Sequence, residues 1–586
     1  MIYRFIDQIL EGYSIDLEIL RRDTNLYSIS LLQHKGVFHF EEDFFGNQNS
    51  QEVAIKFNDF LSKAKDNHSS LVITPEYSCP WDSIRYVLND VQRHPEQGKL
   101  WVLGGESIAP ANVQEFRNAY HGNNNIEVIF NDDIHNAPGG VLLDPCVYIF
   151  KVLNANNEEK TIVLLQFKIQ HMGVWNNALE QQKIIPGQHI YILRNAEDSI
   201  NLATVICSDA MVFDGRRIYL NAPGQWDIQP YIILSIQMNP QPGHIQFREF
   251  RRNILGTSNK DVISINWSSR GRSSNNVNFF NTYCKSNISI ITDHITNTTP
   301  LEESTINGNH KKGLYYVRIK PNRHCFYFTP DVEYFYLRIR KPTVGLGPSP
   351  ANRRRGPEMQ RIYEYDEQLE VFVEIDNTDD GYQSFIESIK IQSQSLQDNA
   401  LNILDKERLI SLTTGEITKG RPGIYWYAVN ALKSFLIEDT ETIKRFTVTF
   451  DEKGRDYRVN QIGKIEDLNV NVLSNPELYP DIIASFKNKC SEVMFLRMNG
   501  IKYNYNLVTN DNQKATVAYI GLSSESEARI ILNKLTRLFP EEELENKRIV
   551  VWYKPNMAAQ SYDSVALEVP KYTSAGQTDL TSITRG

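Results

Sequence analysis

The sequence lacks long apolar runs and paired cysteines. No window approaches the ~20 apolar residues that a membrane-spanning helix needs, and the N-terminus is broken by Asp7, Glu11 and Asp16 where a signal peptide would have an apolar core. The six cysteines are scattered, with no CxxC pair and no His cluster at zinc-finger spacing. This argues against a disulfide framework and a structural zinc site. We therefore expect a cytoplasmic protein without a membrane partner.

The sequence also has fewer basic than acidic residues. The chain has 62 Lys and Arg against 71 Asp and Glu, a net charge of −9, which argues against nucleic acid as its main partner. Apolar residues make up 41% and aromatic residues 11%, so the chain is expected to fold. Its 586 residues exceed one ordinary core and predict two or three folded units.

From about residue 27 to residue 320, short apolar runs such as YSISLLQ, LVIT and LWVLGG alternate with longer amphipathic stretches. This alternation is typical of α/β layers. About ten expected strands would crowd one open sheet, so two sheets packed face to face with helices outside are the better prediction.

The segment GLGPSPANRRRGP, residues 345–357, concentrates Gly, Pro and Arg without apolar periodicity. It predicts a solvated linker at 344–357, in preference to an anion site built from its arginines. The linker would separate a domain at 1–343 from an α/β or α+β accessory domain of unknown function at 358–574. Residues 575–586 are expected to form a frayed tail.

Three chemically reactive side chains each follow an apolar strand. Glu76 follows LVITP, Lys168 follows TIVLLQF, and Cys207 follows NLATVI. Strand ends hold side chains rigidly at the edge of a sheet, which is where α/β proteins build their sites. Taken one at a time, each residue has an ordinary structural interpretation: the Cys as a small buried residue, and the Lys or Glu as a solvated side chain at a strand end. Their order and local contexts favour a shared site.

These contexts resemble the carbon–nitrogen hydrolase (nitrilase) superfamily over about residues 20–320. The matching segments are PEYS at 75–78, Lys168 with His171 and the later Pro186-Gly187, CSD at 207–209, and FREFRRNILGTSNKDVISINW at 247–267. The resemblance implies a nitrilase-like α-β-β-α sandwich that commonly dimerises, so we expect a homo-oligomer. It also implies an amide or nitrile as the small-molecule substrate.

The resemblance assigns a role to each residue. Cys207 would be the nucleophile, and Glu76 the base that takes the thiol proton, passes it to the leaving amine and then activates water. Lys168 would favour the thiolate and, with the backbone N–H of Ser208, stabilise the developing oxyanion. Asp209 belongs to the same turn and is a candidate substrate or oxyanion residue. The chemistry requires no metal and no cofactor.

Some assignments stay open in the sequence. Glu180 is the candidate second glutamate that supports the base and the lysine, with Glu106 as its alternative. Cys79 is a rival nucleophile, although it precedes a proline in a turn, and a thiol at a strand end is better fixed. Ser208 replaces the aromatic residue that usually follows the nucleophile, which predicts an unusual substrate pocket.

The C-terminal half offers no convergent catalytic set. No SGGxDS-type or Walker-type phosphate loop occurs after residue 340, which argues against a glutamine-fed synthetase. DNTDDGYQSFIE, beginning at Asp376, matches the spacing of an EF-hand calcium loop, but the strand-like LEVFVEI before it favours a turn. We therefore expect a binding, regulatory or assembly module.

The leading hypothesis is a cysteine-dependent, amidase-type hydrolase that cleaves a non-peptide carbon–nitrogen bond through a thioester. One alternative is a nitrilase-like binding or sensing scaffold in a larger assembly, for example in bacterial defence or signalling. Another is an acyltransferase, in which an amine captures the thioester instead of water.

Overall fold

The computed structural model describes residues 1–376, 467–487, 507–536 and 548–563. Gaps interrupt these ranges, the longest at 173–178, 274–285, 292–307 and 344–353. Internal contacts divide the chain into two compact units. The first comprises most of the described residues up to 376, and the second most of those from 467 onward.

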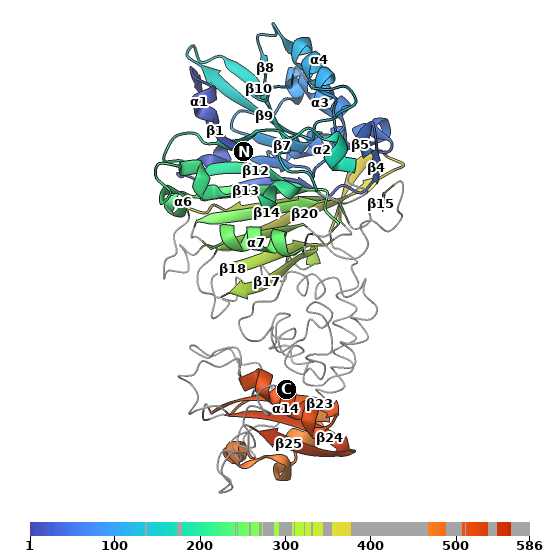
Figure 1. Cartoon of the computed structure of the whole chain (residues 1–586), viewed down its shortest axis with the longest axis vertical. Coiled ribbons are helices and arrows are strands. Elements are labelled where there is room, and N and C mark those ends of the chain that lie inside the picture. Colours follow the sequence, from blue (N-terminus) through green and yellow to red (C-terminus); the bar gives the residue numbers. More distant parts are fainter. Residues whose placement is uncertain are drawn as a thin grey trace. The chain divides into compact units, whose positions relative to one another are not determined.

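Two large β-sheets form the centre of the first unit (Figure 1). The first sheet has the spatial order β1 (Ile2–Phe5), β11 (His189–Leu193), β12 (Asn201–Ile206), β13 (Tyr231–Gln237), β14 (Lys260–Asn266), β16 (Asn287–Ile291), β18 (Arg323–Phe328) and β17 (Leu314–Lys320). The second has the order β21 (Val371–Ile375), β20 (Glu358–Asp366), β19 (Tyr334–Arg340), β3 (Leu26–Leu32), β6 (Leu71–Ile73), β7 (Leu100–Gly104), β9 (Pro145–Asn154), β10 (Glu159–Phe167) and β8 (Ile126–Ile129), with β2 (Tyr13–Ser14) on β9.

The central strands of both sheets are covered on two faces, which explains their apolar sequences. β12, β13 and β14 are parallel neighbours, and every residue in them is buried. In β10, Val163 and Leu165 belong to the core beneath the helices, whereas Gln166, the residue after Leu165, faces the other sheet. Its Nε2 donates a hydrogen bond of 2.9 Å to the carbonyl oxygen of Thr204 in β12. The inner faces of the two sheets therefore pack against each other.

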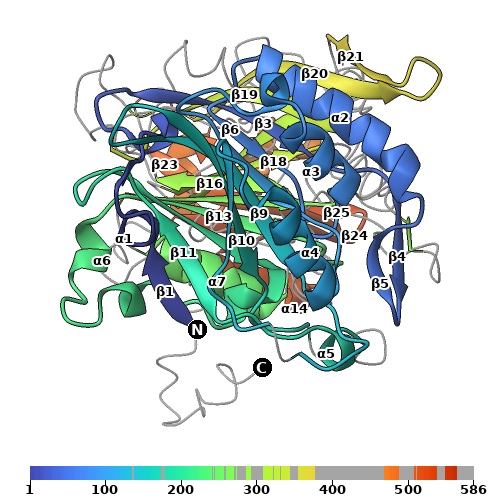
Figure 2. The same ribbon diagram turned by 90° about the horizontal axis from the view of Figure 1, so that it is seen from above.

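Helices cover the two outer faces. α2 (Ser50–Asp66), α3 (Trp81–Leu88) and α4 (Pro110–Tyr120) pack on the second sheet, while α6 (Gln225–Ile228) and α7 (Ile245–Ile254) pack on the first. Figure 2 shows α2, α3 and α4 along one flank and α6 on the opposite flank. The predicted α-β-β-α sandwich is confirmed. A small sheet of β15 (Arg272–Ser273), β4 (Val37–Glu41) and β5 (Phe44–Asn47) lies beside these layers.

The first unit extends beyond the boundary predicted at 344–357. β19 pairs antiparallel with β3, and β20 and β21 continue the same sheet. Arg354, expected in a solvated linker, is only 2% exposed. Its guanidinium forms an ion pair with the buried carboxylate of Asp261 and donates a hydrogen bond of 2.8 Å to the carbonyl oxygen of Ile291. The boundary lies later because backbone pairing and this buried ion pair bind residues 354–376 to the sandwich.

The second unit is a small α/β structure. Its sheet has the order β22 (Leu507–Val508), β23 (Lys514–Leu522), β24 (Ile549–Asn556) and β25 (Ala558–Asp563). β23 and β24 are parallel, and α14 (Glu525–Thr536) lies between them in sequence and packs on β24. Three short helical segments precede the sheet: η8 (Leu468–Leu473), η9 (Pro476–Leu478) and η10 (Asp481–Phe486).

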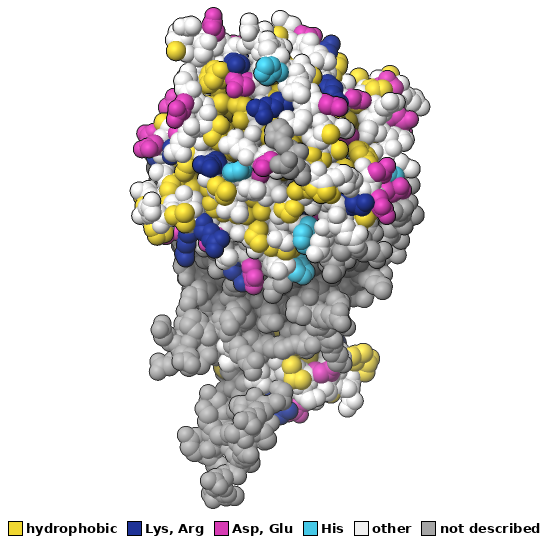
Figure 3. All heavy atoms as spheres, turned by 45° about the horizontal axis from the view of Figure 1, so that its top comes forward, with side chains coloured by type: hydrophobic (Ala, Val, Ile, Leu, Met, Phe, Trp, Pro, Cys, Tyr) yellow, Lys and Arg dark blue, Asp and Glu magenta, His cyan; other side chains and the backbone are white. Residues whose placement is uncertain are grey.

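Several predictions for the C-terminal half lie outside the described residues. These are most of the calcium-loop candidate that begins at Asp376, and the tail at 575–586. Among the helices that are described, none is long and apolar enough to cross a membrane. On the face shown in Figure 3, Lys and Arg side chains are interspersed with Asp and Glu, without a broad basic patch.

The buried pair of Arg354 and Asp261 gives a test of the extended first unit. Replacing Arg354 with Met leaves the carboxylate of Asp261 buried without its cation, so we expect a loss of about 3–5 kcal/mol in the free energy of unfolding. Urea denaturation measures this loss. Arg338→Ala, which alters an exposed arginine of the neighbouring β19, is the matched control and is expected to change stability by less than about 0.5 kcal/mol. Equal stability of the two variants would contradict the burial of Arg354.

Candidate active site

The three predicted catalytic side chains lie at strand ends inside the sandwich. Lys168 directly follows β10, Cys207 directly follows β12, and Glu76 lies in the loop between β6 and α3. All three are 0% exposed. Glu180 comes from the short helix α5 (Leu179–Lys183) and is also buried. The site therefore draws on both sheets and on one connecting segment.

The ammonium group of Lys168 is the centre of the cluster. Its Nζ lies 2.6 Å from Oε1 of Glu76, forms an ion pair with Oε1 of Glu180, and lies 3.6 Å from Oδ2 of Asp144. One oxygen from each of these three carboxyl groups lies within 4.8 Å of the others. Burial alone would lower the pKa of Lys168, but the charges of Glu180 and Glu76 outweigh it and raise this pKa well above its usual value. Lys168 is therefore an ammonium cation.

Cys207 occupies a strained turn. Its φ is +41°, in the left-handed region, where β12 passes into the short helix η4 (Cys207–Met211). Burial, and then the neighbouring carboxylate of Glu76, raise the pKa of the thiol well above its usual value, and Lys168 only partly opposes them. The charge of Lys168 acts in the expected direction, toward the thiolate, but burial and Glu76 outweigh it. The raised pKa favours the protonated form of the Cys207 thiol in this site.

The loop that carries Glu76 is fixed by the other strands. The backbone N–H groups of Ser78 and Cys79 donate to the carbonyl oxygen of Gly104, at 3.0 and 2.8 Å. From the first sheet, the indole N–H of Trp267 donates to the backbone carbonyl of Glu76 at 2.7 Å, and the backbone N–H of Met238 donates to its Oε2 at 2.5 Å. Ends of strands from both sheets thus orient this carboxylate.

Glu180 and Glu106 have different surroundings. Oε1 of Glu180 accepts a hydrogen bond of 3.0 Å from the Tyr77 hydroxyl, and its Oε2 accepts one of 2.6 Å from the backbone N–H of Met172. Glu106 instead accepts hydrogen bonds from Asn47, whose side-chain amide also donates to the carbonyl oxygen of Ser78. Glu180 contacts Lys168, as the first choice in the sequence expected. Glu106 therefore acts through Asn47, which binds the loop that carries Glu76.

Ser208 and Asp209 hold the segment that follows Lys168. The hydroxyl of Ser208 donates to the carbonyl oxygen of Gln170, and Oδ1 of Asp209 accepts hydrogen bonds from the N–H groups of Ile169 (2.8 Å) and Gln170 (2.7 Å). Burial raises the pKa of Asp209 to about 7. These side chains are therefore engaged in fixing the backbone beside the lysine, whereas the backbone N–H of Ser208 as an oxyanion donor stays a prediction.

The rival thiol, Cys79, has the surroundings of a core residue. It is 0% exposed and belongs to the apolar cluster beneath α2, α3 and α4. Burial, and then Glu106, raise its pKa well above the usual value. Lys168, Glu76 and Glu180 do not figure among the groups that influence it. Cys79 is therefore a packing residue.

The sequence did not identify four residues as members of this site: Asp144, Tyr77, Met238 and Trp267. Asp144 is a charge inside the otherwise apolar run VLLDPCVYIF, which is a usable signal because an unpaired charge rarely occurs inside an apolar strand. Met238 and Trp267 directly follow β13 and β14, so their positions are those of strand-end residues. Nothing in their residue types points to the site.

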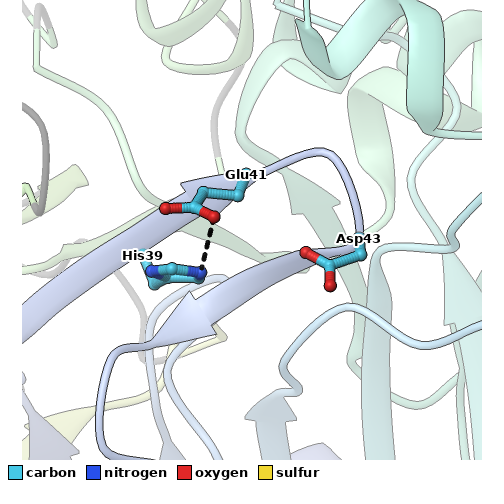
Figure 4. Close-up of side chains that lie close together, drawn as sticks. All are labelled: His39, Glu41 and Asp43. Carbon is cyan, nitrogen blue, oxygen red and sulfur yellow. Dashed lines mark ion pairs between the residues drawn. The ribbon is translucent and has the colours of Figure 1, made fainter.

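A group of side chains with possible metal-ligand atoms lies on the β4–β5 hairpin (Figure 4). Nε2 of His39 lies 3.7 Å from Oε2 of Glu41, and Asp43 lies in the turn between β4 and β5. Glu41 and Asp43 are exposed, and His39 is partly exposed. Exposed groups of this kind are ordinarily solvated, so we assign no metal to them.

No family model and no curated protein matches the sequence. Solved structures similar to it include the NitN amidase of Nesterenkonia sp. AN1, with 14% identity, a TM-score of 0.25, and coverage of 45% of this chain and 84% of the amidase. Another structure of an amidase from Nesterenkonia sp. has 13% identity, a TM-score of 0.26, and coverage of 53% and 94%. A CN-hydrolase superfamily protein of Xanthomonas campestris has 14% identity, a TM-score of 0.27, and coverage of 45% and 83%. Values this low carry no weight here, and the contacts of the chain itself must support its function.

Gly104 gives a test of how the Glu76 loop is held. A Cβ atom at this position would lie 2.1 Å from the carbonyl oxygen of Pro75, so Gly104→Ala must displace the loop backbone. We expect a loss of about 1–3 kcal/mol in the free energy of unfolding, because the contact is with backbone that cannot rotate away. Gly139→Ala is the matched control, since its Cβ would meet nothing within 4 Å. Thermal and urea denaturation compare them, and a stable Gly104→Ala variant would contradict the tight contact.

Proposed function

We propose that this protein is a cysteine-dependent hydrolase of the nitrilase type, which cleaves the carbon–nitrogen bond of a small amide through a thioester. One observation carries the proposal: the buried ammonium of Lys168 contacts the carboxylates of Glu76 and Glu180. The same site includes Cys207, since Glu76 raises the pKa of its thiol and Lys168 lowers it. A base, a cation and a nucleophile in one water-poor cluster suit acyl transfer.

The first step forms a bond between Sγ of Cys207 and the carbonyl carbon of the amide. Glu76 takes the thiol proton as the sulfur attacks, because the thiol is not ionised beforehand. The carbonyl oxygen becomes negative, and the ammonium of Lys168 and the backbone N–H of Ser208 stabilise it. Such donors are worth several kcal/mol, about 3–4 for one donor, in a site closed to water.

The next steps release the amine and restore the enzyme. Glu76 gives its proton to the nitrogen, the carbon–nitrogen bond breaks, and ammonia or an amine leaves while the acyl group stays on Cys207 as a thioester. Glu76 then takes a proton from water as the water oxygen attacks the thioester carbon. The carbon–sulfur bond breaks, the sulfur regains its proton, and a carboxylic acid leaves.

The charges of the cluster also bear on the substrate. Glu76 and Glu180 bring two negative charges against the single positive charge of Lys168. An anionic substrate would therefore be repelled, so we propose uncharged amides, with nitriles as a second choice. An oligomer, membership of the nitrilase superfamily, and a role for the second unit in substrate access or control belong to the same proposal.

Replacement of the nucleophile tests the proposed reaction. Wild-type protein offered a panel of small neutral amides and nitriles should release ammonia or amine, and Cys207→Ala should lower the rate about a thousandfold or more, because no thioester can form. Cys79→Ala is the matched control, since it removes the core thiol and should leave turnover unchanged. Full activity of Cys207→Ala would overturn the assignment. Absence of turnover in the wild type on all substrates would favour a binding or sensing scaffold.

The pH dependence of alkylation tests the coupling between Glu76 and the thiol. The carboxylate of Glu76 raises the pKa of Cys207, so Glu76→Gln should lower this pKa, and iodoacetamide should label Cys207 at lower pH than in the wild type. Hydrolysis should nevertheless be lost, because the base is gone. Glu115→Gln on the exposed face of α4 is the control. An unchanged labelling profile in Glu76→Gln would show that this carboxylate does not act on the thiol.

A further inference from the structure

Asp144 is placed beside Lys168 by the backbone of the second sheet. It directly precedes β9, which pairs antiparallel with β10 so that Pro145 lies opposite Phe167. One residue further along this ladder, the backbone N–H of Lys168 donates a hydrogen bond of 2.9 Å to the carbonyl oxygen of Asp144. The two residues are therefore fixed cross-strand neighbours.

The carboxyl group of Asp144 is buried among like charges. Its side chain is 1% exposed, and its Oδ2 lies 3.6 Å from the ammonium of Lys168, beyond hydrogen-bonding distance. Within the described part of the chain, no N–H or O–H group donates a hydrogen bond to this oxygen. The carboxyl groups of Glu76 and Glu180 face it within the 4.8 Å cluster.

The charge balance of this cluster favours one proton on one of its three carboxyl groups. If Glu76, Asp144 and Glu180 were all ionised, their three negative charges and the positive charge of Lys168 would give −3 + 1 = −2 in a site without solvent. Like charges this close strongly disfavour full ionisation of the group. One proton on a carboxyl group reduces the net charge to −1.

The contacts indicate which carboxyl group carries that proton. Glu76 and Glu180 each contact the ammonium directly, and each also accepts a hydrogen bond from a backbone N–H group, of Met238 and Met172 respectively. Such bonds favour the charged form of a carboxylate. Oδ2 of Asp144 has neither contact at hydrogen-bonding distance, so Asp144 is the member for which ionisation is least favourable.

We propose that Asp144 is kept as a neutral carboxylic acid and donates its O–H to the carboxylate of Glu76, as a positioning residue for the base. This role rests on the hydrolase function proposed above. A hydrogen bond to the ionised Glu76 keeps it in the form that can accept the thiol proton. Burial, and then Glu76, raise the pKa of Asp144 well above its usual value. The titratable groups around it are Glu76, Tyr77, Cys146, Lys168 and Glu180.

Two substitutions of Asp144 distinguish a role as a neutral hydrogen-bond donor from a role that requires its negative charge. Asp144→Asn keeps the shape and supplies an N–H donor without charge, so amide hydrolysis should stay within about fivefold of wild type, the equivalent of one hydrogen bond. Asp144→Ala leaves Glu76 without this donor, and the rate should fall about a hundredfold. Asp198→Asn, in an exposed turn, is the matched control. An Asn variant as impaired as the Ala variant would overturn the proposal.

Infrared spectroscopy tests the proton itself without any substrate. The difference spectrum of wild type minus Asp144→Asn at pH 7 should contain the carbonyl band of a protonated carboxylic acid, and Asp198→Asn should not remove this band. Its absence would overturn the proposal even if Asp144→Ala fails to fold. A protein that shows the band but hydrolyses no amide would refute the proposed function and leave the protonation of Asp144 standing.

Discussion

One buried cation holds the candidate site together. Without the ammonium of Lys168, the carboxyl groups that face one another inside the sandwich would repel each other, and burial would drive them to protonate. The cation in turn stays charged only because those groups outweigh the effect of burial. Cation and carboxylates are thus mutually dependent, and the loss of either partner would leave an uncompensated buried charge. The reactivity of the nearby thiol depends on this balance.

The packing of the two sheets explains how the buried side chains of this cluster are held in fixed positions. Lys168 and Asp144 are neighbours on one ladder of the second sheet, so their backbones cannot drift apart. Strand ends of the first sheet supply Cys207 and the N–H groups that bind Glu76. The two sheets are tied by core packing and by hydrogen bonds such as that from Gln166 to β12. The rigidity of two packed sheets is therefore transmitted to the reacting groups.

Much of this arrangement could be predicted because strand ends are visible in the sequence. Glu76, Lys168 and Cys207 each follow an apolar run, and the layered fold follows from the same runs. The choice between Glu180 and Glu106 could not be settled, because both are carboxylates in suitable stretches and only contacts distinguish them. The raised pKa of the Cys207 thiol could not be predicted, since burial and the position of Glu76 near the thiol have no sequence signature. The domain boundary was misplaced because Arg354 looks solvated until Asp261 is seen beside it.

A thiol that stays protonated at rest has a chemical consequence. The thiolate is the form that oxidants and stray electrophiles attack, so a buried thiol of raised pKa is protected while the site is empty. In the proposed reaction, the same burial makes the proton transfer from Cys207 to Glu76 cost free energy, and this transfer becomes favourable only when the sulfur forms its bond to carbon in the same step. Charge then passes from the sulfur to the substrate oxygen, which the cation of Lys168 can stabilise. The proposed mechanism therefore directs electrostatic stabilisation at the transition state rather than at the resting nucleophile.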